Sequence, residues 1–121
     1  MRDERLSEDE QMIFTNHLQT LCDANGLRLR IIEECVVGAY PLERLVHMIP
    51  VVFIEDYCIG LHEIGHCVLR HDPSQRREWK EILAWKWAVK NSLFWDRQME
   101  EHRVWCLQCW GIVDDDPAKY L

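Results

Sequence analysis

The sequence has no long hydrophobic run and only a modest number of cysteines. No apolar stretch approaches the roughly 18 residues of a membrane-spanning helix, and residues 1–5 are too charged for a signal peptide. Six cysteines in 121 residues fall below the roughly 8–10% typical of disulfide-built secreted domains. We therefore expect a cytoplasmic protein with reduced thiols and no membrane association.

Positive charge is also scarce. Fourteen Lys and Arg stand against 21 Asp and Glu, which gives a net charge of −7. So acidic a chain is not expected to bind nucleic acid directly, whereas a basic protein would suit it as a partner. There is no internal repeat, low-complexity tract or linker, and the length suits a single domain, residues 1–121.

The most informative feature that is present is the run His62-Glu63-Ile64-Gly65-His66, which has the pattern H-E-x-x-H. On a helix, residues four apart lie on one face, so both imidazoles can bind a single Zn²⁺. Glu63 lies about 100° around the helix, where its carboxylate can take a proton from a water molecule on the metal. The motif predicts a zinc hydrolase with Glu63 as catalytic base.

A hydrolytic zinc site needs a third protein ligand and an open position. The candidates are His71, Asp72, Glu78 and Glu81. His71 would lie on the far side of the motif helix if that helix continued, and Asp72 suits the N-cap of a following helix. Glu81 is central on an apolar helix face and Glu78 is about 60° away from it. Because a buried carboxylate needs a partner, we predict Glu81 as the third ligand.

The motif and its downstream segment resemble the ImmA/IrrE group of small bacterial and phage zinc peptidases. The family pattern is H-E-[LI]-G-H, often a further His, then E-x-x-A-x-x-x-A, matched here by His62, Glu63 and His66 and then by Glu81, Ala84 and Ala88. The resemblance covers about residues 50–90, and it has Trp85 where members characteristically carry Asn. It implies a metallopeptidase, often encoded on mobile elements, that cleaves a DNA-binding repressor.

The remaining patterns predict an α+β, zincin-like fold: a small sheet packed against a helical hairpin that carries the motif, with a helix at each end. Expected helices begin at Ser7 and end at Gly26, and span 56–70, 73–94 and 96–110; expected strands span 27–31, 36–40 and 51–54. The strands 36–40 and 51–54 are both candidates for the sheet edge that binds substrate as an added strand.

Two further features, the oxyanion candidates and a pair of cysteines, have open interpretations. His102 and Tyr40, with His71 and Tyr57 as alternatives, are candidates to stabilise an oxyanion, as a downstream His or Tyr does in related gluzincins. Cys106 and Cys109 form a C-x-x-C pair that would need further ligands, such as His102 with Cys22, Cys35 or Cys58, to bind a second metal.

All six tryptophans follow residue 78. We expect most to pack between helices, although exposed aromatic residues also mark interaction surfaces.

The sequence thus predicts a zinc-dependent endopeptidase for a specific protein, with a helix-turn-helix repressor as the implied substrate. The alternative is a non-catalytic zinc protein that binds a partner through its Trp-rich last third, which a cleft blocked by Trp85 would favour.

Overall fold

The computed structural model describes residues 4–34 and 36–121. The chain forms an α+β fold, as predicted, with a mixed sheet of three strands. Its helices are α1 (Glu8–Ala24), α2 (Ile54–Val68), α3 (Arg77–Asn91), α4 (Arg97–Cys109) and a final 3-10 helix (Pro117–Tyr120). Its strands are β1 (Arg28–Ile31), β2 (Gly38–Tyr40) and β3 (Leu45–Met48).

The central strand of the sheet is β3, which pairs parallel with β1 and antiparallel with β2. Val46 is the register partner of both Leu29 and Ala39. In the turn between β2 and β3, Arg44 has a φ of 53°, and its guanidinium donates to the carbonyls of Asn25 and Cys67 at 2.7 and 3.0 Å. This side chain therefore fixes the hairpin to the C-terminal ends of α1 and α2.

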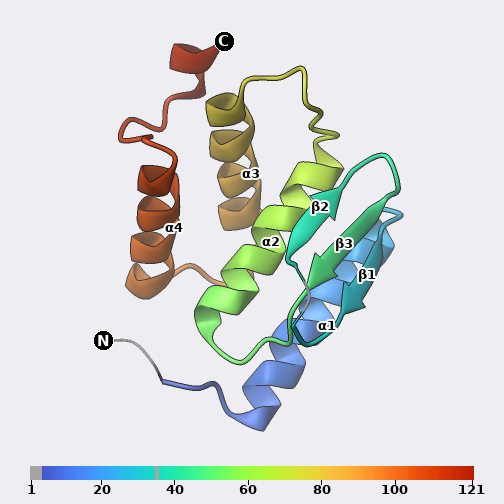
Figure 1. Ribbon diagram of the computed structural model, residues 1–121. Coiled ribbons are helices and arrows are strands. Elements are labelled where there is room, and N and C mark those ends of the chain that lie inside the picture. The colour runs from blue at the N-terminus through green and yellow to red at the C-terminus, as the bar shows by residue number, and fades with distance from the viewer. Residues whose placement is uncertain (1–3, 35) are drawn as a thin grey trace.

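The core lies where α1 and α2 pack together and against the sheet (Figure 1). Val46 and Met48 of β3 are fully buried there, as is Leu18 of α1. A Cβ atom at Gly60 of α2 would lie 2.7 Å from Leu18 Cδ1 and 3.4 Å from Met48 Cε, so the absence of a side chain permits this close contact. Helices α3 and α4 lie across α2 from the sheet (Figure 1).

Several predicted helix ends are confirmed. Ser7 and Glu10 form the capping box of α1, and Asp96 accepts from Met99 N at the start of α4. Gly26 and Gly111 follow α1 and α4 with φ values of 67° and 76°, the left-handed conformation in which helices commonly end. Local hydrogen bonding and backbone conformation fix these positions, which is why the sequence predicts them.

The strand predicted at residues 51–54 is wrong. Val51 and Ile54 are buried, but the segment pairs with no described strand, and α2 begins at Ile54. The carboxylate of Asp56 accepts from the backbone N–H groups of Val52 and Phe53 at 3.0 and 2.9 Å. These amides satisfy their hydrogen bonds at the helix start, so a buried run that could suit a strand serves instead as a helix entry.

The boundary between the two motif helices also differs from prediction. The first helix ends at Val68, and Arg70 adopts a φ of 55°. The N–H of His71 then donates to the carbonyl of His66 at 3.1 Å, a bond typical of the Schellman helix end. The chain therefore turns back on α2 at His71.

The second motif helix begins at Arg77 rather than at Pro73. Asp72 is a turn residue and not a helix N-cap: its carboxylate accepts from Ser74 N at 2.8 Å, and its own N–H donates to Gln75 Oε1 at 2.9 Å. These bonds are of the kind that cap a helix, but here they close an isolated turn. The helices are joined by an eight-residue connection, residues 69–76, instead of a tight hairpin.

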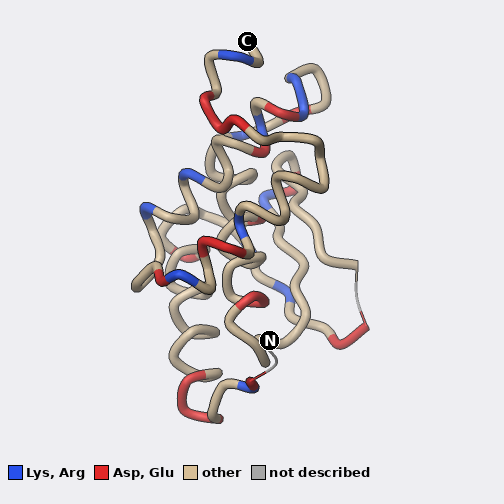
Figure 2. Tube along the Cα trace, turned by 90° about the vertical axis from the view of Figure 1, so that its left-hand side faces the viewer, with Lys and Arg blue, Asp and Glu red and all other residues tan. Residues whose placement is uncertain are grey.

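In the described part of the chain, no helix has the length and apolar character needed to span a membrane. Lys and Arg positions are scattered among Asp and Glu positions over the elements (Figure 2).

Candidate metal site

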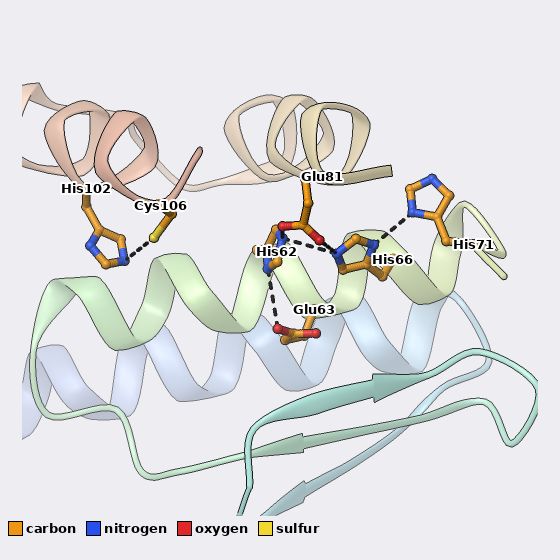
Figure 3. A network of polar contacts seen from close by, with 7 residues as sticks. All are labelled: His62, Glu63, His66, His71, Glu81, His102 and Cys106. Carbon is orange, nitrogen blue, oxygen red and sulfur yellow. Dashed lines mark hydrogen bonds and ion pairs between the residues drawn. The ribbon is translucent and has the colours of Figure 1, made fainter. Parts of the chain in front are cut away.

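Two helices bring the predicted ligands together. His62 and His66 lie one turn apart on the side of α2 that faces α3, and Glu81 projects from α3 between their rings (Figure 3). All three side chains are at most 13% exposed. Glu78, the rejected alternative, has a 34% exposed side chain and lies 3.7 Å from Arg76 Nε. The helical phase predicted from the apolar face of α3 therefore holds.

The approach of α2 to α3 depends on small residues. A Cβ at Gly65 would lie 2.9 Å from the carbonyl oxygen of Ala84 and 3.4 Å from its Cα. Such a contact with backbone atoms cannot be relieved by rotation of a side chain. Gly65 in the motif and Ala84 one turn after Glu81 thus allow the carboxylate to reach the histidines.

The three ligand groups converge at short distances. His62 Nε2 lies 2.9 Å from Glu81 Oε1, His66 Nε2 lies 2.9 Å from Glu81 Oε2, and the two nitrogens are 3.1 Å apart. Each nitrogen thus lies near one oxygen of the same carboxylate and near the other nitrogen, and these separations are comparable with those between donor atoms that each lie about 2 Å from one zinc ion. Two imidazole nitrogens directed at one carboxylate also form a suitable donor set for zinc, so these residues fit the metal.

Glu63 lies beside this triangle. One carboxylate oxygen is 3.4 Å from Nδ1 of His62, the ring atom opposite the one that faces Glu81. His62, Glu63 and His66 also offer potential ligand atoms within 4.8 Å of one another, the one such group of metal-binding side chains in the described chain. Because both Nε2 atoms point to Glu81, Glu81 is the stronger candidate for a third ligand, and Glu63 is a neighbouring carboxylate.

His71 contacts the site through the ring of His66. Its Nδ1 lies 2.8 Å from Nδ1 of His66 (Figure 3), and burial, together with the nearby His66 and Lys80, lowers the pKa of His71 to about 4. A neutral His71 can accept the Nδ1 proton of His66, which leaves Nε2 of His66 as the free lone pair for a metal.

The sequence prediction ended the motif helix at residue 70 but missed this role of His71, because it judged the side chain's direction as if the helix continued. A signal was available in Pro73, which disfavours helical conformation at Asp72. That restriction indicates an end to the helix near His71, where the side chain is free to fold back.

The buried charges are mutually stabilising. Burial opposes protonation of His62, but hydrogen bonds with Glu63 and Glu81 outweigh it and raise the pKa of His62 to about 9. Burial likewise opposes ionisation of Glu81, and hydrogen bonds from His62 and His66 still lower the pKa of that carboxyl well below its usual range. The site is therefore built to hold a carboxylate next to positive charge, which a divalent cation also supplies.

Two cavities open beside the site. The first, of about 470 Å³, adjoins the residues of the ligand triangle and is walled by Trp85 and by Trp105 and Trp110 at the C-terminal end of α4. The second, of about 360 Å³, lies toward the end of α2 and includes Ala39 and Pro41 at the end of β2. Glu63, His66, Glu81 and Trp110 line both cavities.

The tryptophans divide into two groups. Trp85 is 1% exposed, and Trp87 and Trp95 are partly buried against the core, as the packing prediction requires. Trp105 and Trp110 are 61% and 47% exposed. These two form a rim of the first cavity, so part of the aromatic content is accessible next to the candidate site.

Of the two oxyanion candidates, His102 lies away from His62, His66 and Glu81 (Figure 3). His102 is on α4, with Nε2 3.5 Å from Cys106 Sγ (Figure 3), and Tyr40 packs edge-on against His47 at a centroid distance of 5.1 Å. Of the alternatives, Tyr57 is a buried residue whose hydroxyl lies 2.7 Å from His17 Nδ1. The oxyanion role of His102 or Tyr40 stays a prediction.

A second metal at the C-x-x-C pair gains no support. Cys106 and Cys109 line the first cavity, but within residues 4–34 and 36–121 they complete no second group of three metal-binding side chains. Of the other proposed ligands, Cys22 and Cys58 are buried in the core, and Cys35 lies outside the described residues. Burial raises the pKa of Cys106 to about 11, which favours the protonated thiol.

Comparisons with protein-family models, with curated proteins and with solved structures find no match to this chain. The resemblance to the ImmA/IrrE group therefore rests on the motif residues themselves.

Proposed function

We propose that this protein is a zinc-dependent endopeptidase with a zincin-like site. The observation that carries the proposal is the convergence of His62 Nε2, His66 Nε2 and the Glu81 carboxylate at about 3 Å from one another, next to two open cavities. His62, His66 and Glu81 would hold the ion. Zinc bound there supplies a Lewis acid that polarises a peptide carbonyl and lowers the pKa of water to about 7.

Glu63 is the residue proposed to move the proton. It lines both cavities, so its carboxylate can meet a water molecule and a peptide that spans them. The carboxylate takes a proton from the attacking water and then passes it to the leaving amine. Its oxygen near Nδ1 of His62 also orients that imidazole, which places Nε2 toward Glu81.

The substrate is proposed to bind as an extended strand along β2. This strand is at an edge of the described sheet, and Ala39 and Pro41 line the same cavity as Glu63 and His66. Of the two edges expected from sequence, the segment 51–54 is not a strand, so β2 (Gly38–Tyr40) is the candidate. The unpaired backbone groups of such an edge can bind peptide without reading its side chains.

The non-catalytic alternative is favoured by one observation, the exposure of Trp105 and Trp110. Both residues nevertheless line the cavity that contains the candidate ligands, which suits contact with a substrate. In either case the resemblance makes a helix-turn-helix repressor encoded nearby the first protein to test.

The test uses zinc-loaded protein with repressors from neighbouring genes, and follows cleavage by mass spectrometry. Wild type should cut one of them, whereas Glu63→Gln should retain zinc and lose about 10²–10⁴-fold in rate, because an amide cannot accept the proton. Equal cleavage by both proteins would refute the assignment of Glu63. Absence of cleavage by either, with stable complexes formed, would support the binding alternative.

A further inference from the structure

The second cavity has a chemical character that the metal site does not require. Besides the residues it shares with the candidate site, it is lined by Arg77 and Lys80, which lie one turn apart at the start of α3. Among the described residues, neither cation has a carboxylate within the 4 Å of an ion pair. Two cations without a carboxylate partner therefore line one cavity, in a chain whose net charge is −7.

Both cations are held in place by contacts that leave their charge available. The Arg77 guanidinium lies over the Trp110 ring, 4.6 Å from its centroid, a cation–π contact that leaves its N–H edge free to donate. Lys80 Nζ donates to the carbonyl oxygen of Asp72 at 2.9 Å and has two further protons to donate. Restraint of long side chains before binding reduces the entropy lost when a ligand arrives.

The acidic residues at this cavity leave room for an additional anion. Glu81 and Glu63 face the histidines and belong to the proposed zinc site. The carboxylate of Asp72 accepts from the N–H and hydroxyl of Ser74, which lower the pKa of Asp72. With a divalent cation balancing Glu63 and Glu81, the two cations face one carboxylate, so the cavity has a net positive charge.

We infer that this cavity binds an acidic side chain of the substrate, with Arg77 and Lys80 as specificity-determining residues. The inference rests on the proposed peptidase function and adds the substrate class: a peptide with Asp or Glu beside the scissile bond.

The direction of β2 indicates on which side of the scissile bond the acidic substrate residue lies. Strand β2 runs toward the second cavity, in the same sense as α2 (Figure 3), and its following residue Pro41 lines that cavity. A substrate strand antiparallel to β2, the slightly more stable pairing, enters at the second cavity and continues to the first. The acidic residue therefore lies on the N-terminal side of the scissile bond.

Two peptide hydroxamates provide the probes, because the hydroxamate binds zinc and anchors the preceding residues. Acetyl-Leu-Leu-Glu-hydroxamate and its Gln counterpart differ only in the charge of the side chain next to the hydroxamate. Their dissociation constants for zinc-loaded protein are measured by isothermal titration calorimetry. Wild type should bind the Glu peptide about tenfold more tightly, since a charge-assisted contact contributes about that factor. The preference should weaken as salt is added.

Variants of this chain test which residues cause the preference. Lys80→Met and Arg77→Gln should each reduce it, and the double variant should abolish it. Lys86→Glu is the matched control: it is an exposed α3 position outside this cavity, so the preference should persist. Two single variants are used in case one of them disturbs the 69–76 connection. Thermal unfolding shows whether each variant is folded.

Two outcomes would overturn the inference, and they are distinguishable. If both peptides bind wild type with equal, zinc-dependent affinity, the acidic subsite is wrong and the metal site stands. If protein incubated with excess zinc takes up none by elemental analysis, and neither peptide binds to it, the proposed function fails and the subsite fails with it.

Discussion

The indole of Trp85 stacks on the imidazole of His62, with ring centroids 4.6 Å apart and planes inclined by 23°. Trp85 occupies the position where members of the resembled family carry Asn. An indole that blocked the cleft there would favour the non-catalytic alternative. Because the indole is 1% exposed, it forms a wall behind His62, and about 470 Å³ remain open beside it. The substitution therefore restrains a candidate ligand without filling the space for substrate.

The first prediction concerns the ligand set. His62→Ala, His66→Ala and Glu81→Ala should each reduce zinc affinity by more than about 100-fold, since each removes a ligand and not only a supporting contact. Glu78→Ala is the control from the same helix, with its carboxylate near Arg76, and should bind zinc as wild type does. Competition with a chromophoric chelator measures the affinities. A larger loss in Glu78→Ala than in Glu81→Ala would reverse the assignment of the third ligand.

The second prediction concerns His71, which contacts His66 but not the proposed metal position. His71→Ala should lower zinc affinity by about 10–100-fold, the usual effect of removing a residue that orients a ligand. His102→Ala, whose ring contacts Cys106 and Trp85, serves as the control. Equal affinities of the two variants, measured by the same competition, would show that His66 needs no support from His71.

The third prediction is a pH dependence of the zinc-free protein prepared with a chelator. The pKa of His62 is raised to about 9 by hydrogen bonds with Glu63 and Glu81 that outweigh burial. A raised histidine pKa stabilises the fold fully below about 6.5, the pKa in the unfolded chain, and this contribution is lost as pH rises through 9. The urea concentration at the unfolding midpoint should therefore decrease as the pH is raised from 7 to 9.

Two controls accompany this titration. Glu81→Gln should show a weaker decrease, because it removes one of the groups that raise the His62 pKa. Zinc-loaded wild type should not show the decrease, since ligating imidazoles are neutral. A urea midpoint of the zinc-free protein that is constant or rises from pH 7 to pH 9 would contradict the charge state assigned to His62.

The fourth prediction concerns the contact between the two motif helices. Gly65→Ala should destabilise the protein by about 1–3 kcal/mol through overpacking, because the new methyl group meets the Ala84 backbone at 2.9 Å. Gly60→Ala should cost less, since its close neighbours are side-chain atoms of Leu18 and Met48. Denaturant unfolding measures both. Gly65→Ala should also weaken zinc binding by separating Glu81 from the histidines, and a fully retained zinc affinity would contradict that link.

The sequence determined those features that depend on local chemistry and helical phase. The four-residue spacing of His62 and His66 sets them on one face, and the apolar neighbours of Glu81 set that carboxylate on the facing side of α3. The capping box at Ser7 and the left-handed glycines Gly26 and Gly111 likewise follow from local backbone bonding. Each of these needs only the positions of nearby residues.

The tertiary structure decided which partner each buried segment meets. Residues 51–54 and 45–48 are both short and apolar, but only the second pairs as a strand, because Asp56 engages the amides of Val52 and Phe53. His71 joins the site only because α2 ends at Val68 and the chain reverses at Arg70. The spacing of apolar residues in the sequence indicates which residues are buried. Which residues they contact depends on how α2, α3 and the connection between them fold together.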